Sequence, residues 1–174
     1  METKSSCVYD VLDTRFGQVL ISEFAKTSKL VAVYFYEGAD TISILQETFP
    51  SFSFSEGQVS CSDAVIKAIN SLHCGLKIDI YYKTEGEFTL KVLEYLRTIP
   101  RGHTQSYSQI AAAIGHPTAA RAVARACATN NVAYLIPCHR VIASNGSVSG
   151  YRWGIEKKKK ILKAEGAEIS HCVM

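Results

Sequence analysis

The sequence predicts an α+β protein in two parts, in which strands dominate the first part and helices the second. Residues 7–36 hold three runs rich in β-branched and aromatic residues, a composition typical of strands. Residues 88–164 instead repeat apolar residues at intervals of three and four, the period of amphipathic helices. Residues 1–86 carry 7 Lys and Arg against 11 Asp and Glu, whereas residues 87–174 carry 12 against 5. We therefore place a domain boundary between residues 86 and 87.

The first part is predicted to begin as a three-stranded antiparallel meander. Residues 7–13 and 18–23 flank a short polar segment, Thr14 to Gly17, that can form a tight turn. Residues 29–36 supply the third strand. The later elements expected here are helices at 41–49 and 62–72, a loop at 51–57, a short strand at 78–82 and a polar link at 84–87.

The second part is predicted to contain a helix-turn-helix. One helix covers residues 88–96 and ends before Pro100, because proline cannot continue a helix. Ser106 can cap the next helix with its hydroxyl, and Gly115-His116-Pro117 breaks the chain sharply. A third helix is expected at 117–128, with Pro117 in its first turn. The remaining expectations are an extended segment at 132–136, a small hairpin at 141–148 and a last helix at 155–164.

Composition and termini restrict the class of protein. The chain is 47% hydrophobic and 20% charged, as in ordinary globular proteins. No apolar run is long enough to cross a bilayer, and the first residues lack the apolar core of a signal peptide. We expect a cytoplasmic or nuclear protein without a membrane partner. The six cysteines show no paired short spacing, and His73-Cys74 stands alone, so we expect neither a metal nor a cofactor.

The third predicted helix is unusually slim. Alanine occupies six positions between residues 119 and 128, while Arg121 and Arg125 lie one turn apart on the same face. Such a helix can approach a nucleic-acid groove closely and reach its phosphates or base stack. The residues alone leave open an alanine-rich core helix with two surface arginines. The basic second half is equally consistent with a polyanion partner or with a solvated lysine cluster at 157–160.

Cys138 stands between Pro137 and His139, with Arg140 following. A thiol attacks as thiolate, and a nearby histidine or arginine can lower its pKa. Adjacency alone leaves a purely structural cysteine open. Cys61, Cys74 and Cys127 lack such neighbours and are interpreted as small hydrophobic residues, and Cys7 and Cys172 lie near the ends of the chain.

Residues 88–166 resemble the O6-alkylguanine-DNA alkyltransferases. Four segments carry this resemblance: Ser-Tyr-Ser-Gln-Ile-Ala from Ser106, Ala-Arg-Ala-Val from Ala120, Ile-Pro-Cys-His-Arg-Val-Ile from Ile136, and Gly-Tyr-Arg-Trp-Gly from Gly150. The last segment is most similar to bacterial adaptive-response proteins, which would imply a bacterial cytoplasm. The resemblance implies a ribonuclease-H-like cap at 1–86. It also implies a mostly helical, winged-helix-like domain at 87–174 with the helix-turn-helix.

The activity that the resemblance implies is stoichiometric and irreversible repair. The alkyl group of O6-methylguanine in double-stranded DNA, and by extension that of O4-methylthymine, would move to Cys138 in a monomeric protein. His139 would take the thiol proton through a water molecule, and Glu165 would orient His139. Tyr107 would help rotate the nucleotide and then donate a hydrogen bond to the base.

The resemblance also assigns residues to DNA and to the extruded base. Arg121 would enter the base stack from a helix in the minor groove, and Asn130 would tie this helix to the active-site segment. Asn131 replaces a proline common in the family, which predicts a looser hinge. Further DNA contacts are assigned to Thr118, Ala120, Arg125 and Tyr107, and the base pocket to Val141, Tyr151, Arg152 and Lys158.

Two other functions are compatible with parts of this pattern. A DNA-binding protein without chemistry would recognise alkylated bases and leave them in place, but it would not need Cys138 with His139 and Glu165. A cysteine hydrolase could use the same three residues, but it would not need Arg121 on a slim helix.

Overall fold

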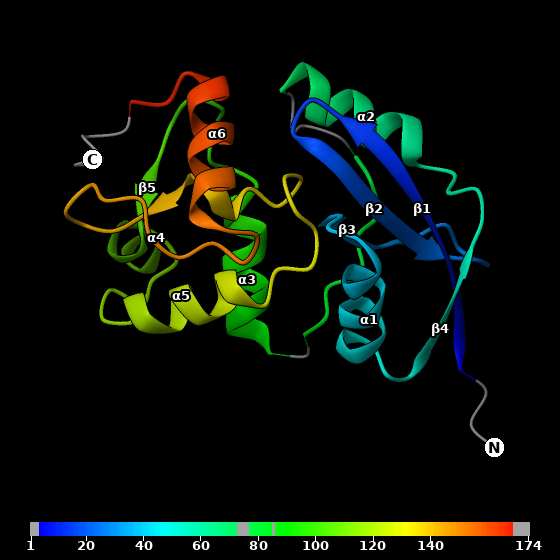
Figure 1. The fold of residues 1–174 in the computed structure, drawn as a ribbon. Coiled ribbons are helices and arrows are strands. Elements are labelled where there is room, and N and C mark those ends of the chain that lie inside the picture. Colours follow the sequence, from blue (N-terminus) through cyan, green and yellow to red (C-terminus); the bar gives the residue numbers. More distant parts are fainter. Residues whose placement is uncertain (1–3, 73–76, 85, 169–174) are drawn as a thin grey trace.

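A computed structural model of the chain describes residues 4–72, 77–84 and 86–168 and shows an α+β fold, as predicted. In Figure 1 a lobe built on a sheet, drawn in blue to green, stands beside a mostly helical lobe, drawn in green to red. We call them the sheet lobe and the helical lobe. Cys74, Cys172 and residue 85 of the predicted link at 84–87 lie outside the described residues. No helix in the described ranges is long and apolar enough to cross a membrane.

The sheet has four strands in the order β3-β2-β1-β4. The predicted antiparallel meander is confirmed by β1 (Ser5–Thr14), β2 (Gly17–Phe24) and β3 (Leu30–Phe35). The loop predicted at 51–57 is wrong, because β4 (Phe52–Glu56) pairs in parallel with β1. Its alternate rings explain the pairing: Phe52 stacks on Phe49 with ring centroids 5.3 Å apart, and Phe54 packs beside them.

Two helices cover opposite faces of this sheet (Figure 1). Alternate strand residues point to opposite faces: Val19 and Ile21 of β2 pack with α2 (Ser62–Ser71), and Leu20 packs with α1 (Ala39–Thr48). All six residues of β3 are buried, since the helical lobe also covers the free edge of this strand. The strand predicted at 78–82 is reduced to an isolated bridge between Ile80 and Leu30.

The helical lobe contains the predicted helix-turn-helix. Its helices are α3 (Glu87–Leu96), α4 (Tyr107–Ala113), α5 (Ala120–Ala128) and α6 (Ile155–Glu165). Ser106 caps α4 as predicted, and Gln109 completes a reciprocal capping box. The third predicted helix begins three residues late, at Ala120, because the amide of Ala119 closes a turn onto the carbonyl of His116.

Two short segments differ from their predictions. Residues 132–136 are turns rather than an extended strand: Tyr134 has a φ of 69°, and Val132 alone forms a bridge, to Val33. These residues are all apolar because they are buried, and a continuous apolar run does not distinguish a buried turn from a buried strand. The hairpin predicted at 141–148 is also wrong. β6 (Val141–Ile142) pairs in parallel with β5 (Gln105–Ser106), a partner far along the chain, and residues 143–147 only close a turn.

Candidate active site

Cys138 lines a cavity of about 320 Å³ in the helical lobe. The cysteine begins the short 3-10 helix η1 (Cys138–Arg140) and is 5% exposed. Helix α5 contributes small side chains to the opposite wall, so the slim helix that the sequence predicted leaves room for a ligand next to the sulfur. The lining residues are Tyr107, Ala124, Cys127, Ala128, Cys138, Gly150, Tyr151 and Arg152.

The amide of Asn130 holds the Cys138 sulfur. Its Nδ2 donates to Sγ over 3.1 Å and to the carbonyl of Ile136 over 2.9 Å, while its Oδ1 accepts from the amide of Val132. Burial raises the pKa of the Cys138 thiol, and the Asn130 hydrogen bond, followed by the charges of Lys158 and Arg152, opposes that rise. The resting group is therefore a neutral thiol beside donors that favour its thiolate.

His139 and Glu165 form a buried pair behind the cysteine. Nε2 of His139 lies 3.2 Å from Oε1 of Glu165. Arg140 donates to both Glu165 oxygens, over 2.9 and 2.7 Å. These donors lower the pKa of Glu165 to about 2 against its burial, and burial lowers the pKa of His139. Glu165 is thus ionised and His139 neutral near pH 7. Nδ1 of His139 is buried without a hydrogen-bond partner among the described residues.

Tyr107 and Gly150 lie next to each other on the wall of the cavity. Burial, followed by the nearby Cys127 and Cys138, raises the pKa of Tyr107 to about 12, so its hydroxyl remains a donor at neutral pH. Gly150 has a φ of 53°, and a Cβ there would lie 3.4 Å from the Tyr107 hydroxyl. The left-handed backbone favours glycine here, and a Cβ would be in van der Waals contact with the hydroxyl. The neighbouring Tyr151 hydroxyl is buried and has no partner in the described part of the chain.

Lys158 anchors this loop to α6. It is fully buried, and its Nζ donates to the carbonyls of Val141, Ser149 (2.8 Å) and Gly150 (3.2 Å). Burial lowers the pKa of Lys158 to about 8. The helical period explains why this lysine alone is buried within a run of four. Lys158 lies three and four residues before the buried Ile161 and Leu162, on the inner face of α6.

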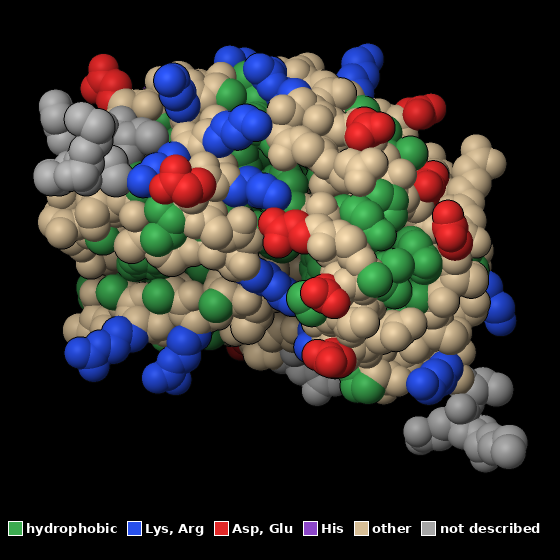
Figure 2. All heavy atoms as spheres, in the orientation of Figure 1, with side chains coloured by type: hydrophobic (Ala, Val, Ile, Leu, Met, Phe, Trp, Pro, Cys, Tyr) green, Lys and Arg blue, Asp and Glu red, His purple; other side chains and the backbone are tan. Residues whose placement is uncertain are grey.

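Of the residues predicted to touch DNA, Tyr107 lines the cavity, and the others are not among its lining residues. Arg121 and Arg125 are both exposed on α5, as their spacing predicted, and Thr118 is exposed just before this helix. Figure 2 shows basic side chains projecting from the edge of the molecule where α5 lies in Figure 1. No three His, Cys, Asp or Glu side chains converge within the described ranges where they could hold a metal ion.

Residues 87–167 match the family described as 6-O-methylguanine DNA methyltransferase, DNA binding domain. A probable methylated-DNA–protein-cysteine methyltransferase of Acanthamoeba polyphaga mimivirus is 31% identical over 156 residues, which cover 90% of this chain and 95% of the viral protein. The chain belongs to the methylated-DNA–protein-cysteine methyltransferase family. The bifunctional transcriptional activator/DNA repair enzyme Ada of Escherichia coli is 38% identical over 162 residues, or 90% of this chain. The chain spans only 45% of Ada, and less than half of several other curated relatives.

Solved structures of family members share the fold. The Mycobacterium tuberculosis O6-methylguanine methyltransferase is 29% identical, with a TM-score of 0.69 over 92% of this chain and 93% of the other. The archaeal enzyme from Pyrococcus kodakaraensis is 25% identical, with a TM-score of 0.75 over 92% and 99% of the two chains. A structure of the mycobacterial protein in complex with DNA is 29% identical, with a TM-score of 0.71 over 91% and 92%.

The structure brings most of the predicted alkyltransferase residues together. Tyr107, Tyr151 and Arg152 line the cavity with Cys138. Asn130 contacts the sulfur, Glu165 pairs with His139, and Lys158 contacts Val141 and the loop. Thr118, Ala120, Arg121 and Arg125 are not among the lining residues. Arg152 lines the cavity, but its side chain extends toward the sheet lobe and donates to the Tyr34 hydroxyl over 3.2 Å. The sequence suggested Arg140 as a charge that lowers the pKa of the Cys138 thiol, but it missed the pairing of Arg140 with Glu165, which is 25 residues away.

Proposed function

We propose that this protein repairs alkylated guanine in double-stranded DNA by transferring the alkyl group from O6 of the base to Sγ of Cys138. The observation that carries the proposal is the Cys138 thiol on the wall of a cavity, hydrogen-bonded by Asn130, with a neutral His139 and an ionised Glu165 behind it. A cavity of about 320 Å³ suits one extruded base rather than a stretch of duplex. The names of the viral and Escherichia coli relatives support the same reaction.

His139, Cys138 and Tyr107 each carry out one part of the proposed reaction. His139 accepts the Cys138 proton at Nδ1, through a water molecule, because its Nε2 already faces Glu165. The thiolate attacks the alkyl carbon, an S–C bond forms, and the C–O bond breaks with its electron pair moving to the base. Tyr107 stabilises the leaving guanine by donating a hydrogen bond to it. The product is a thioether, a bond that is stable to hydrolysis, so each molecule acts once.

The rest of the cavity would recognise the base. The carbonyls of Cys138 and Val141 would accept from the exocyclic amine of guanine. The Val141 carbonyl already accepts from Lys158, but an oxygen with two lone pairs can take a second donor. Tyr151 and the backbone of Arg152 would close over the ring.

Helix α5 would deliver the base to this cavity. In this proposal α5 enters the minor groove, Arg121 fills the space that the extruded base leaves, and Asn130 keeps α5 in register with Cys138. Further contacts to the duplex would come from Thr118, Ala120, Arg125 and Tyr107. We also propose that the protein acts as a monomer. Its cap would be ribonuclease-H-like at 1–86 and its DNA-binding domain winged-helix-like at 87–174.

The fate of the damaged base tests the proposal. Duplex carrying O6-methylguanine is mixed with increasing amounts of protein, digested, and assayed for O6-methylguanine and guanine nucleosides. We expect guanine to replace the damaged base one for one until the protein is used up. Guanine produced in excess of protein would show turnover, and unchanged DNA that stays bound would indicate a lesion-binding protein without chemistry.

A further inference from the structure

Asn131 joins the sheet lobe to the active-site segment. Its side chain is 2% exposed, and its Nδ2 donates to the carbonyl of Val31 in β3. The backbone repeats the connection, because the amide of Val33 donates to the Asn131 carbonyl over 3.0 Å and the amide of Ala133 donates to the Val33 carbonyl over 2.8 Å. The looser hinge predicted from Asn131 is therefore not observed: the asparagine is tied to a strand.

The strand that Asn131 contacts is well suited to hold it. β3 pairs with β2 on one side, is covered by helices on both faces, and is buried at all six positions. The β2–β3 register is shifted beside Val31, and a buried carbonyl needs a donor. The Asn131 amide supplies this donor from the helical lobe.

The next residue back, Asn130, points the opposite way. Its amide reaches the Cys138 sulfur over 3.1 Å, while its carbonyl oxygen Oδ1 accepts from the amide of Val132 over 2.9 Å. Two consecutive buried asparagines thus link Val31 in the sheet to the sulfur in the cavity. A displacement of the backbone at Asn131 changes the position of the Asn130 amide, because the two residues share a peptide bond.

We propose that Asn131 is a positioning residue for Cys138: by tying the segment to Val31, it keeps the Asn130 amide on the sulfur and makes the sheet lobe part of the active site. This inference rests on the proposed function for its biological meaning, but the geometry concerns thiol reactivity alone. The donor from Asn130 favours the thiolate. Loss of the Asn131 anchor should therefore leave a less reactive sulfur in a folded protein.

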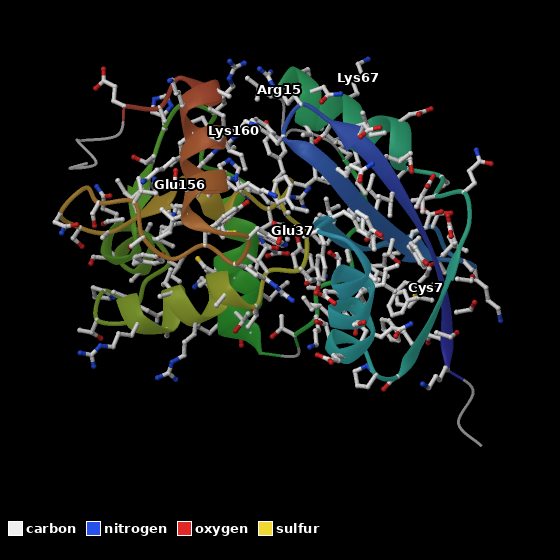
Figure 3. The ribbon with its side chains drawn as sticks, in the orientation of Figure 1. Cys7, Arg15, Glu37, Lys67, Glu156 and Lys160 are labelled. Carbon is white, nitrogen blue, oxygen red and sulfur yellow. The ribbon has the colours of Figure 1, made fainter. Side chains whose placement is uncertain are left out.

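Glu37 offers a matched control at the same boundary between the lobes. Its carboxylate accepts from Nζ of Lys157 over 3.4 Å, linking the end of β3 to α6, and the label in Figure 3 places it between the two lobes. The Glu37 side chain is 72% exposed, and none of its hydrogen bonds runs to Asn130 or Cys138. Glu37→Gln therefore removes the charge from a contact between the lobes without touching the path to the sulfur.

The test measures iodoacetamide labelling of the peptide that contains Cys138, from pH 6 to pH 10, in wild type, Asn131→Ala and Glu37→Gln. Far-UV circular dichroism and thermal unfolding fix a temperature at which all three are folded. We expect Asn131→Ala to label about tenfold more slowly at pH 7.5, with the inflection of its pH profile moved to higher pH. Glu37→Gln should match wild type.

A wild-type rate and inflection in folded Asn131→Ala would overturn the proposal, as would an equal change in Glu37→Gln. If Asn131→Ala does not fold, Asn131→Ser, whose shorter side chain cannot span to Val31 as the amide does, carries the same expectation. Iodoacetamide needs neither DNA nor alkyl transfer. A protein that fails to repair DNA can therefore still support or contradict the role of Asn131.

Discussion

Nε2 of His139 lies 3.2 Å from Oε1 of Glu165, and neither side chain is exposed. The same carboxylate accepts two hydrogen bonds from Arg140, whose Nη1 also donates to the Ile99 carbonyl over 2.5 Å. In the proposed mechanism Glu165 orients the histidine, and the same carboxylate neutralises a buried guanidinium.

Replacing Glu165 by Gln should destabilise the protein. The change removes the negative partner of a buried charge, which typically costs about 3–5 kcal/mol, and urea unfolding at pH 7 measures it. Glu156→Gln is the control. Glu156 is on the same helix but 87% exposed, and it pairs with Lys159 at the surface. Its replacement should therefore change the free energy of unfolding by less than about 0.5 kcal/mol. Equal effects would contradict the account.

Acid should remove the Glu165 contribution. The folded pKa of Glu165 is about 2 and its ordinary value 4.5, so the unfolded chain binds the proton first as the pH falls. The stabilisation is complete above about pH 4.5 and is lost as the pH falls toward 2. The stability difference between wild type and Glu165→Gln should therefore shrink below pH 4.5. A difference that stays constant from pH 6 to pH 3 would show that the ionised carboxylate is not its source.

Replacing Lys158 by Met should slow alkyl transfer. The substitution fills similar space but leaves the carbonyls of Val141, Ser149 and Gly150 without their shared donor, so the loop over the cavity loosens. We expect transfer from free O6-benzylguanine to slow by about tenfold. Lys160→Met, at an exposed position of the same lysine run, should retain the wild-type rate, and a loss of rate there would indicate a nonspecific charge effect.

Tyr107→Phe should reduce the transfer rate with little change in duplex affinity. The hydroxyl is neutral at pH 7, because its pKa is about 12, and in our account its hydrogen bond to guanine strengthens as the base leaves. Loss of one such donor typically costs about 100-fold. Single-turnover kinetics and duplex binding separate the two quantities. A wild-type rate would assign Tyr107 to packing alone.

Arg121→Ala should slow repair of duplex far more than reaction with free O6-benzylguanine. The side chain is exposed and lies outside the cavity, so it can help to extrude the base but cannot help the chemistry on a free base. The ratio of the two rate constants is the measurement. Equal slowing would show that Arg121 has no role in base extrusion.

Arg125→Ala should instead reduce the salt dependence of duplex binding, by the amount expected for the loss of one phosphate contact.

The sequence correctly predicted the features that depend on residues close together along the chain. The strands at 7–13, 18–23 and 29–36, the helices of both lobes and the cap at Ser106 follow from periodicity and side-chain chemistry close along the chain. The motif around Cys138 likewise marked the thiol itself, and the helical period of α6 accounts for the burial of Lys158.

The features that the sequence did not predict depend on distant partners. β4 exists because Phe52 packs on Phe49 beside β1, and β6 exists because Gln105 and Ser106 pair with it from 36 residues earlier. Arg140 acquires its role only when α6 brings Glu165 to it. Asn131 was expected to loosen a hinge, whereas contact with β3, 100 residues away in sequence, fixes it.

The most direct test of the central claim is the mass of the protein after reaction with one equivalent of duplex that contains O6-methylguanine. Intact mass and peptide mapping are compared for wild type and Cys138→Ala. Our account predicts one added methyl group per wild-type molecule, on the peptide that holds Cys138, and none on Cys138→Ala, which should still bind the duplex. A methyl group on another residue, or no added mass in wild type with the DNA still bound, would contradict it.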